Sequence, residues 1–310
     1  MSADGTRTPA RRGQRDQRED GAHYSLSDEV ASGALPELSA PERRQVAQRA
    51  AISAAVVHEA VRDEGERELR RHPAALAWSG LAAGLSMGFS LVGQGLLRAA
   101  LPAAPWRPLV ASLGYTLGFL IVILGRQQLF TENTVTPILP LLAHPDRRTF
   151  ARVGRLWAIV LAANLLGALL FATLIAHTAV FAPDTQRAFV EIGREGIRAG
   201  FGLTLLRAVF AGWLIALMVW LLPGAEAARL QVILIITYVV GLGGFAHIIA
   251  GSVDVMYLAS AGQIAWTSYL GGFLAPTLIG NVIGGVALVA ALNFAQVSSE
   301  TLGAGERSQG

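Results

Sequence analysis

Six long blocks without a charged residue constrain this chain more than any other feature of its sequence. Five of them have roughly the 17–25 residues that a helix needs to cross about 30 Å of hydrocarbon, and the sixth is too long for one crossing. We predict that the sixth divides near residues 259–263, "ASAGQ". The blocks are 73–97, 108–125, 156–182, 208–225, 230–253 and 255–299.

The composition agrees with a protein that crosses a membrane several times. Hydrophobic residues make up 53% of the chain, charged residues make up 15%, and the mean hydropathy is +0.46. A soluble helical bundle is the alternative, but soluble domains are seldom this apolar over such long blocks. We therefore predict an all-α integral membrane protein.

Several other classes of protein are disfavoured. All 25 basic residues are arginine, and the twelve before residue 72 are interleaved with acids, so no nucleic-acid partner is expected. The absence of cysteine excludes disulfides and thiolate metal sites. No metal or cofactor site is predicted. The spans carry no HExxH motif and no cluster of carboxylates, so we predict that the chain is not an enzyme. The polar first forty residues argue against a cleavable signal peptide.

The ends of the chain differ from the apolar blocks. Residues 1–40 are rich in Gly, Ser, Pro, Asp and Arg, and we predict a disordered cytoplasmic tail. Over 41–72, apolar residues recur at helical spacing between charges, which predicts an amphipathic helix at the membrane surface or against the bundle, with a solvated helix as the alternative. A pore domain is expected over 73–297 and a second cytoplasmic tail over 298–310. The apolar positions of the amphipathic helix are Val46, Ala50, Ile52, Val56, Val57 and Val61.

The distribution of arginine predicts the orientation. Twelve arginines precede the first block, and four more follow the second pass in "AHPDRRTFARVGR". The connection between the first two blocks has only two, and the loop expected around 183–198 mixes arginines with acids. The positive-inside rule therefore favours six passes with both termini in the cytoplasm.

Two of the passes are interrupted. The run "RQQLFTENT", residues 126–134, breaks the second pass, and glycines weaken the fifth around His247 in "GLGGFAHIIAGS", residues 241–252. Irregular backbone at membrane depth must be buried in protein or line a wet cavity. Broken helices at matching places in two halves are typical of an inverted-repeat transport site.

The two halves match in register. Asn164 lies in "AANLLGALL" after the first break, and Asn281 lies in "IGNVIGGVAL" after the second. Thr131 precedes Asn164 by 164 − 131 = 33 residues, and His247 precedes Asn281 by 281 − 247 = 34. We therefore predict two inverted three-helix repeats, with helices 2 and 5 broken.

Three segments together resemble a known family. "GFAHIIAGS" resembles the central histidine segment of the formate–nitrite transporter family, "LFTEN" the loop that interrupts its second helix, and "PTLIGNVIGG" its last helix. "GRQQLFTENT" and "AGSVDVMYL" look most like its YfdC-like branch. The resemblance covers roughly residues 45–297. It implies an aquaporin-like six-helix protomer in a homopentamer of the bacterial plasma (inner) membrane, passing small monovalent anions such as formate, nitrite or hydrosulfide, or their weak acids.

The resemblance also implies the residues of the pore. His247 matches the central histidine and Thr131 the loop threonine that faces it. Ala246 and Gly251 depart from the family pattern, in which glutamate and asparagine are common at these positions. The other pore residues so implied are Leu129, Phe130, Tyr115, Phe119, Val240 and Asn281, to which the internal repeat adds Asn164.

The chemistry of such a pore is coherent with these residue types. Moving a bare anion from water into an apolar medium costs several kcal/mol of free energy or more. The barrier to its passage therefore falls only if the pore supplies a hydrogen-bond donor or a proton near the midplane of the membrane. An imidazole, with a reference pKa of about 6.5, can supply either, and the hydroxyl of Thr131 can position the ring or the permeant. Apolar residues on both sides would exclude hydrated ions. We predict a channel or a proton-coupled transporter, with protons as its second partner.

Structural roles remain open for the same residues. His247 can be a helix–helix contact, Thr131 a helix cap, and Asn164 and Asn281 contacts between helices, while the aromatic residues can serve in packing. A pore for a neutral small solute or another small ion is the alternative function, and a non-transporting scaffold is a further one.

Embedded charges add a question that the sequence leaves open. Arg126 and Arg207 lie within or next to the apolar blocks, where an unpaired charge is costly. Asp254 and Glu132 are the candidate partners.

Overall fold

The computed structural model describes residues 52–291 together with Ser39, Pro41 and residues 295–296. The chain divides into two compact units, Met1–Ala51 and Ile52–Gly310, and the continuous stretch 52–291 belongs to the second. Apart from Ser39, the predicted tails 1–40 and 298–310 lie outside the described residues, as do Val46 and Ala50 of the predicted amphipathic helix.

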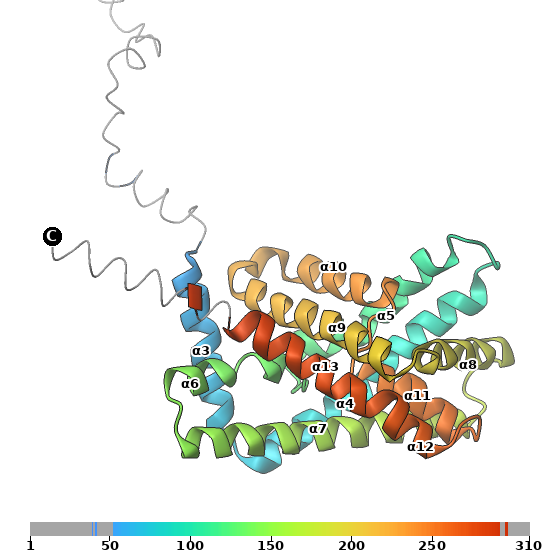
Figure 1. The fold of residues 1–310 in the computed structure, drawn as a ribbon. Helices are drawn as coiled ribbons and strands as arrows, with labels where there is room; N and C mark the ends of the chain where they lie inside the picture. Colours follow the sequence, from blue (N-terminus) through green and yellow to red (C-terminus); the bar gives the residue numbers. More distant parts are fainter. Residues whose placement is uncertain (1–38, 40, 42–51, 292–294, 297–310) are drawn as a thin grey trace, which may run out of the picture. The chain divides into compact units, whose positions relative to one another are not determined.

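The described part of the chain is helical throughout and contains no strand. Figure 1 shows α3 and α6 at one end of the long helices and α8 and α12 at the other. The helices are α3 (Ala54–Arg70), α4 (Pro73–Ala100), α5 (Arg107–Leu124), α6 (Ile138–Ala143), α7 (Arg147–Ala176), α8 (Pro183–Ile197), α9 (Phe201–Leu221), α10 (Arg229–Leu242), α11 (Ala250–Ser260), α12 (Trp266–Ser268) and α13 (Ala275–Gly285). Short 3₁₀ turns are η1 (Glu132–Thr134), η2 (Leu222–Gly224) and η3 (Glu226–Ala228), and π-helical segments are η4 (Tyr269–Leu274) and η5 (Val286–Ala291).

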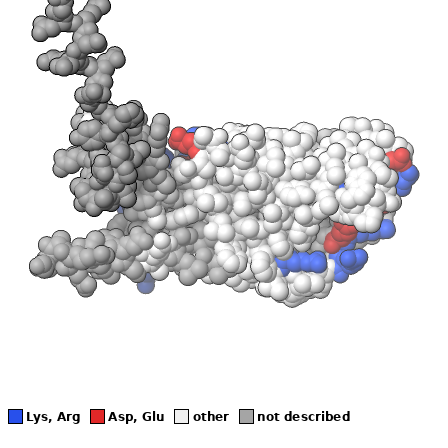
Figure 2. All heavy atoms as spheres, turned by 90° about the horizontal axis from the view of Figure 1, so that it is seen from above, with Lys and Arg blue, Asp and Glu red and all other residues white. Residues whose placement is uncertain are grey.

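Four helical segments of the described residues are long and apolar enough to cross a membrane: α4, α5, α7 and Phe201–Gly224. Large apolar side chains on their outer surfaces, such as Leu113, Leu170 and Phe210, are exposed. On the face shown in Figure 2, the charged side chains gather towards the two ends, and the surface between them carries none. An uncharged belt of this kind suits contact with lipid.

The helix α3 buries one face only. The side chain of Ser53 caps its first turn by accepting a hydrogen bond from the N–H of Val56 at 3.4 Å. Val57 and Val61 are buried, whereas Val56, predicted on the same apolar face, is 54% exposed. Val56 is exposed because the buried face of α3 follows the helical period from Val57 and Val61 through residues 65, 68 and 69, and Val56 lies to one side of it. Gly65 is needed on this face, since its Cα lies against the carbonyl of Thr136.

The same glycine-mediated contact occurs in both halves. Gly84 of α4 packs on the backbone carbonyl of Asn164 in α7, and Gly212 of α9 packs on the backbone carbonyl of Asn281 in α13. A Cβ atom at either glycine would clash with the backbone of the partner helix. Each asparagine is thereby held close to the neighbouring helix of its own half.

Two connections have more structure than a loop. The segment expected as a loop around 183–198 forms the amphipathic helix α8, whose buried residues recur at helical spacing. The long last block divides after Ser260, as predicted, and Gly262 has a positive φ of 69° in the turn. The buried residues of α8 are Thr185, Ala188, Phe189, Ile192 and Gly193.

Candidate functional site

Two helices, α5 and α10, stop at exposed residues before the chain turns into the buried segments around Leu129 and His247, and they stop in the same way. After α5 the chain takes a left-handed conformation at Arg126 (φ 51°), and after α10 it does so at Gly244 (φ 59°). In both cases the N–H of the next residue bonds the carbonyl five residues earlier, at 2.9 and 3.1 Å. This arrangement is a Schellman motif, which ends a helix while satisfying its last carbonyls. The two ends are 244 − 126 = 118 residues apart.

An asparagine holds the open backbone of the first interruption. Nδ2 of Asn164 donates to the carbonyls of Gly80 and Gln128, at 2.7 and 2.8 Å, and its Oδ1 accepts from the N–H of Phe130 at 2.9 Å. The amide therefore binds both sides of Leu129 and ties them to α4. These bonds satisfy backbone groups that no helix pairs, as required in a membrane.

Asn281 does the same for the second interruption. Its Nδ2 donates to the carbonyls of Ala208 and Ala246, at 2.8 and 2.9 Å, and its Oδ1 accepts from the N–H of Ile248 at 2.8 Å. The residue held between these contacts is His247. Because 247 − 129 = 118, the counterpart of His247 in the first half is Leu129, two residues before Thr131.

The imidazole of His247 is 1% exposed, and both of its nitrogens form hydrogen bonds. Nδ1 accepts from the N–H groups of Ile249 and Ala250, at 3.3 and 3.2 Å, so Nδ1 carries no proton. In a neutral ring the proton is then on Nε2, which lies 2.8 Å from Oγ1 of Thr131 and donates to it. The Thr131 hydroxyl retains its own proton, which no other described residue accepts.

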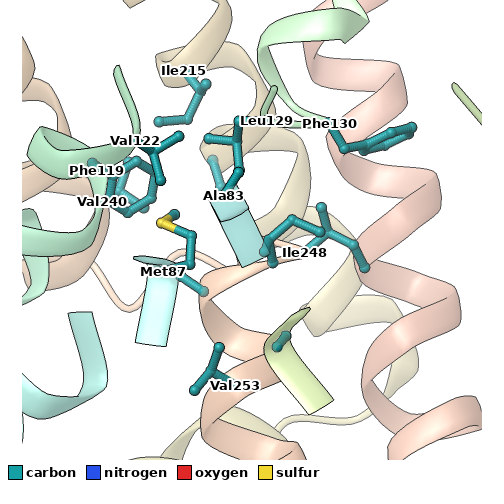
Figure 3. Packing of buried hydrophobic residues seen from close by; sticks show 14 of the residues in the cluster. Ala83, Met87, Phe119, Val122, Leu129, Phe130, Ile215, Val240, Ile248 and Val253 are labelled. Carbon is teal, nitrogen blue, oxygen red and sulfur yellow. The ribbon is translucent and has the colours of Figure 1, made fainter. Parts of the chain in front are cut away.

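Aromatic and aliphatic side chains enclose this pair. The ring of Phe119 meets His247 edge-on with centroids 4.9 Å apart, and Tyr115 follows at 5.3 Å from Phe119. Figure 3 shows Phe119 with Val240 on one side and Leu129 across from them. All of these side chains are buried. Of the predicted site residues, Tyr115, Phe119, Leu129 and Val240 are thus brought together around His247 and Thr131.

Phe130 takes a different direction. Its ring lies 5.9 Å from that of Trp157 in α7, and Figure 3 shows it apart from Phe119 and Val240. The backbone N–H of Phe130 donates to Asn164 of the same helix α7, so the backbone and the ring of Phe130 both contact α7. The structure therefore places Phe130 in packing against α7.

Two cavities lie near the buried pair, one lined by residues of α8 and the other by residues of α3. The α8 cavity has a volume of about 250 Å³ and reaches His247. The α3 cavity has a volume of about 540 Å³ and reaches Gln128. No residue lines both, and Phe119, Leu129 and Thr131 line neither. Further residues of the α8 cavity include Tyr115, Glu195, Arg198, Arg207, Val240 and Asp254, and those of the α3 cavity include Glu64, Glu68, Arg126, Glu132 and Arg229.

The embedded charges do not form the ion pairs that the sequence suggests. Arg207 and Asp254 line the α8 cavity, and Arg126 and Glu132 line the α3 cavity. None of the four makes an ion pair or a side-chain hydrogen bond with another described residue. Arg126 is exposed and the other three are half-buried, and each of the four lines a cavity instead of facing an oppositely charged partner.

Sequence reasoning missed other features of the site. Phe273, from the π-helical η4, lines the α8 cavity and its ring occupies the space that a side chain at Gly251 would need. The only sequence signal for this position of Phe273 would be a one-residue shift in the helical spacing of apolar residues, which a π-helical segment produces.

Residues 84–88 read G-L-S-M-G, the pattern of a nucleophile elbow, but they lie inside α4 and not at a strand-to-helix turn.

Comparison with known proteins identifies relatives of this chain. Residues 55–295 match the family described as Formate/nitrite transporter. The chain is 42% identical to "Inner membrane protein YfdC" of Escherichia coli (strain K12) over 247 residues, which cover 80% of each chain. It is 28% identical to "Formate channel BtFdhC" of Bacillus thuringiensis, over 61% of this chain and 74% of that one.

Two solved structures share the fold. "Pentameric formate channel with formate bound" matches with a TM-score of 0.62 over 76% of this chain and 98% of that chain. "FNT family ion channel" matches with a TM-score of 0.65 over 77% of this chain and 98% of that chain. Each is 19% identical in sequence, so the likeness concerns the fold.

Proposed function

The chain belongs to the formate/nitrite transporter family, and from this premise we propose that it carries a small monovalent anion, or its weak acid, past His247 and Thr131. The observation that carries the proposal is the hydrogen bond between Nε2 of His247 and Oγ1 of Thr131. This polar pair lies between the two cavities, among the buried apolar side chains of Phe119 and Leu129, which we call the apolar wall.

The hydrogen-bond geometry favours a donor role for this pair. A permeant anion accepts the free proton of the Thr131 hydroxyl, while Nε2–H of His247 donates to the same oxygen and strengthens it as a donor. This donor offsets part of the cost of bringing an anion out of water. A cationic ring would place a proton on Nδ1, opposite the N–H groups of Ile249 and Ala250, so proton relay through the ring requires that the ring turn.

The wall determines what passes. Phe119 and Leu129 are fully buried and line neither cavity, so we expect a hydrated ion to lose its water where it passes them. The relative named as a formate channel supports formate as the first anion to test.

We further propose a six-pass arrangement with both termini in the cytoplasm of a bacterial inner membrane. The passes are α4, α5 with α6, α7, α9, α10 with α11, and α12 to α13, so that residues 73–297 form the pore domain and 41–72 precede it. The relative named as an inner membrane protein supports the location, and the solved channel named as pentameric supports a homopentamer with one pore in each protomer. Because the chain has no cysteine, single cysteines introduced near either end can be probed for accessibility in vesicles.

Flux into proteoliposomes tests the function. We expect purified protein to admit formate, nitrite or hydrosulfide and not an uncharged solute such as urea. His247→Ala should abolish most of the flux, whereas His247→Gln should retain part of it, because the amide can still donate to Thr131 but cannot titrate. His144→Ala, at an exposed position outside the pore, is the matched control.

The outcomes separate the rival functions. If His247→Gln is as inactive as His247→Ala and uptake follows the pH gradient, the ring relays a proton. If urea passes and none of the anions does, the pore conducts neutral solutes. Anion flux unchanged in His247→Ala would remove His247 from the path.

A further inference from the structure

Arg207 is the charged side chain that the proposed function leaves unexplained. It belongs to α9, one of the helices suited to cross a membrane, and it lines the α8 cavity together with His247. It is half-buried and forms no ion pair with any described acid. An unpaired charge within a transmembrane segment is costly and by default marks a functional position.

We propose that Arg207 binds the anion in the α8 cavity before it reaches His247, and that Arg98 and Arg107 keep Arg207 free by holding the acids of α8. This inference rests on the proposed function and assigns the first binding step of the same pathway. The class of ligand is a small planar oxyanion such as formate or nitrite.

The chemistry of the guanidinium suits this ligand. Arginine is charged at all relevant pH values, and its planar fork donates two parallel hydrogen bonds to a carboxylate or a similar oxyanion. Thr204, one turn before Arg207 on α9, lines the same cavity, but its hydroxyl donates to the carbonyl of Ala199. Arg207 is therefore the donor that this face of α9 offers to the cavity.

The acids of α8 would compete with an anion for Arg207 if they were free. Glu195 lines the same cavity, but its carboxylate accepts a hydrogen bond from Arg98 at 3.0 Å. Glu191 lies 3.5 Å from Nε of Arg98 and 3.8 Å from Arg107. The side chain of Arg98 is 13% exposed, whereas those of Glu191 and Glu195 are 54% exposed, so solvent partly screens these ion pairs. Two arginines thus neutralise the two glutamates from the side of α4 and α5.

The other charges of the cavity leave this assignment intact. Arg198 is exposed between α8 and α9, where it attracts anions to the entrance but does not lie within a membrane-crossing helix. Asp254 of α11 is half-buried in the cavity and forms no ion pair with another described residue. No described carboxylate, Asp254 included, is in ion-pair contact with Arg207, so no acid occupies its guanidinium in this structure.

The test measures initial rates of formate uptake by the full-length protein in proteoliposomes. Arg207→Gln should raise the KM for formate between about tenfold and a hundredfold, the worth of one charge-assisted interaction, with a smaller change in the maximal rate. Arg207→Lys should raise the KM less, because the charge remains while the fork is lost. Arg187→Gln, on the exposed face of α8, is the control and should leave the KM unchanged.

A double substitution tests the role of Arg98. Arg98→Gln should raise the KM several-fold, because the freed Glu195 competes with formate for Arg207. Adding Glu195→Gln should return the KM to within about twofold of the unmodified protein. If Arg98 only anchors α8, the double variant loses the same anchor and stays impaired, which refutes this part of the proposal. A KM unchanged in Arg207→Gln refutes the other part.

A binding measurement separates this inference from the proposed function. Formate and nitrite should raise the Tm of the purified protein, and Arg207→Gln should lose that shift. If the anions raise the Tm in an Arg207-dependent way without being transported, the inference holds and the proposed function fails. If neither anion shifts the Tm nor crosses the membrane, both fail.

Discussion

The two asparagines that hold the interrupted helices provide a matched pair of substitutions. Asn164 and Asn281 each form three hydrogen bonds to backbone groups, two as donor and one as acceptor, at distances between 2.7 and 2.9 Å. Both side chains are fully buried. Asn→Leu keeps the branching and the number of heavy atoms of the side chain but removes all three bonds, so hydrogen bonding is tested without creating a cavity.

The expected magnitude follows from these contacts. One net hydrogen bond contributes about 1 kcal/mol in soluble proteins and about 0.6 kcal/mol on average in a membrane protein. Loss of three bonds should therefore lower the free energy of unfolding by about 2 to 3 kcal/mol, and by more if the freed backbone groups find no water. Because the bonds are the same in number and type, Asn164→Leu and Asn281→Leu should lose similar amounts.

Flux should separate the two variants. Asn281 holds the residues on both sides of His247, whereas Asn164 holds those on both sides of Leu129. We expect Asn281→Leu to lose more anion flux than Asn164→Leu at equal loss of stability. Equilibrium unfolding in detergent and proteoliposome flux are the assays. A change below about 0.5 kcal/mol in either variant, or a greater flux defect in Asn164→Leu, would refute the reasoning.

Three further predictions concern stability. Gly84→Ala should destabilise the protein by about 1 to 3 kcal/mol because the new Cβ meets the backbone of Asn164, whereas Gly154→Ala in the open should not; thermal unfolding compares them. Arg126→Gly should raise the free energy of unfolding by about 1 kcal/mol, because a non-glycine residue is strained at a φ of 51°. A loss of flux in the same variant would show that the guanidinium of Arg126 has a role in the α3 cavity. Burial raises the pKa of Glu68, which is 8% exposed, against the opposing effect of Arg71. Its contribution to stability is therefore present below about pH 4.5, its ordinary pKa, and is lost as the pH rises through the raised value; Glu68→Gln should remove this dependence from an unfolding curve measured against pH.

Much of the fold could be predicted because its constraints act locally. The charge-free blocks follow from the thickness of the hydrocarbon, and the polar run after Arg126 and the glycines around His247 mark where a helix cannot continue. The family resemblance predicted that Thr131 faces His247, and the structure places Oγ1 of Thr131 2.8 Å from Nε2 of His247.

The rest depends on contacts that a linear reading does not contain. The sequence pairs Thr131 with His247 by counting residues to the asparagines, but the hydrogen bonds pair Leu129 with His247. The ring of Phe130 packs against Trp157 of α7, a contact that no pattern of residue types encodes. The ion pairs of Glu195 with Arg98 join residues 97 positions apart, and only the packing of α8 on α4 brings them together.

The pairing of Leu129 with His247 explains how a repeated fold builds a site that is not symmetric. Both halves use the same helix ending, the same asparagine contacts and the same close approach of a glycine to the asparagine backbone. These features satisfy the backbone and leave the bracketed side chain free to differ. In the first half this side chain is Leu129, which builds the apolar wall, and the hydroxyl comes from Thr131 two residues later. In the second half it is His247, whose Nδ1 is held by the turn entering α11, so that only Nε2 faces the first half. At this point the two halves meet in the hydrogen bond between Thr131 and His247. A second imidazole at Leu129 would place two donors where the proposed pathway needs one donor and one wall.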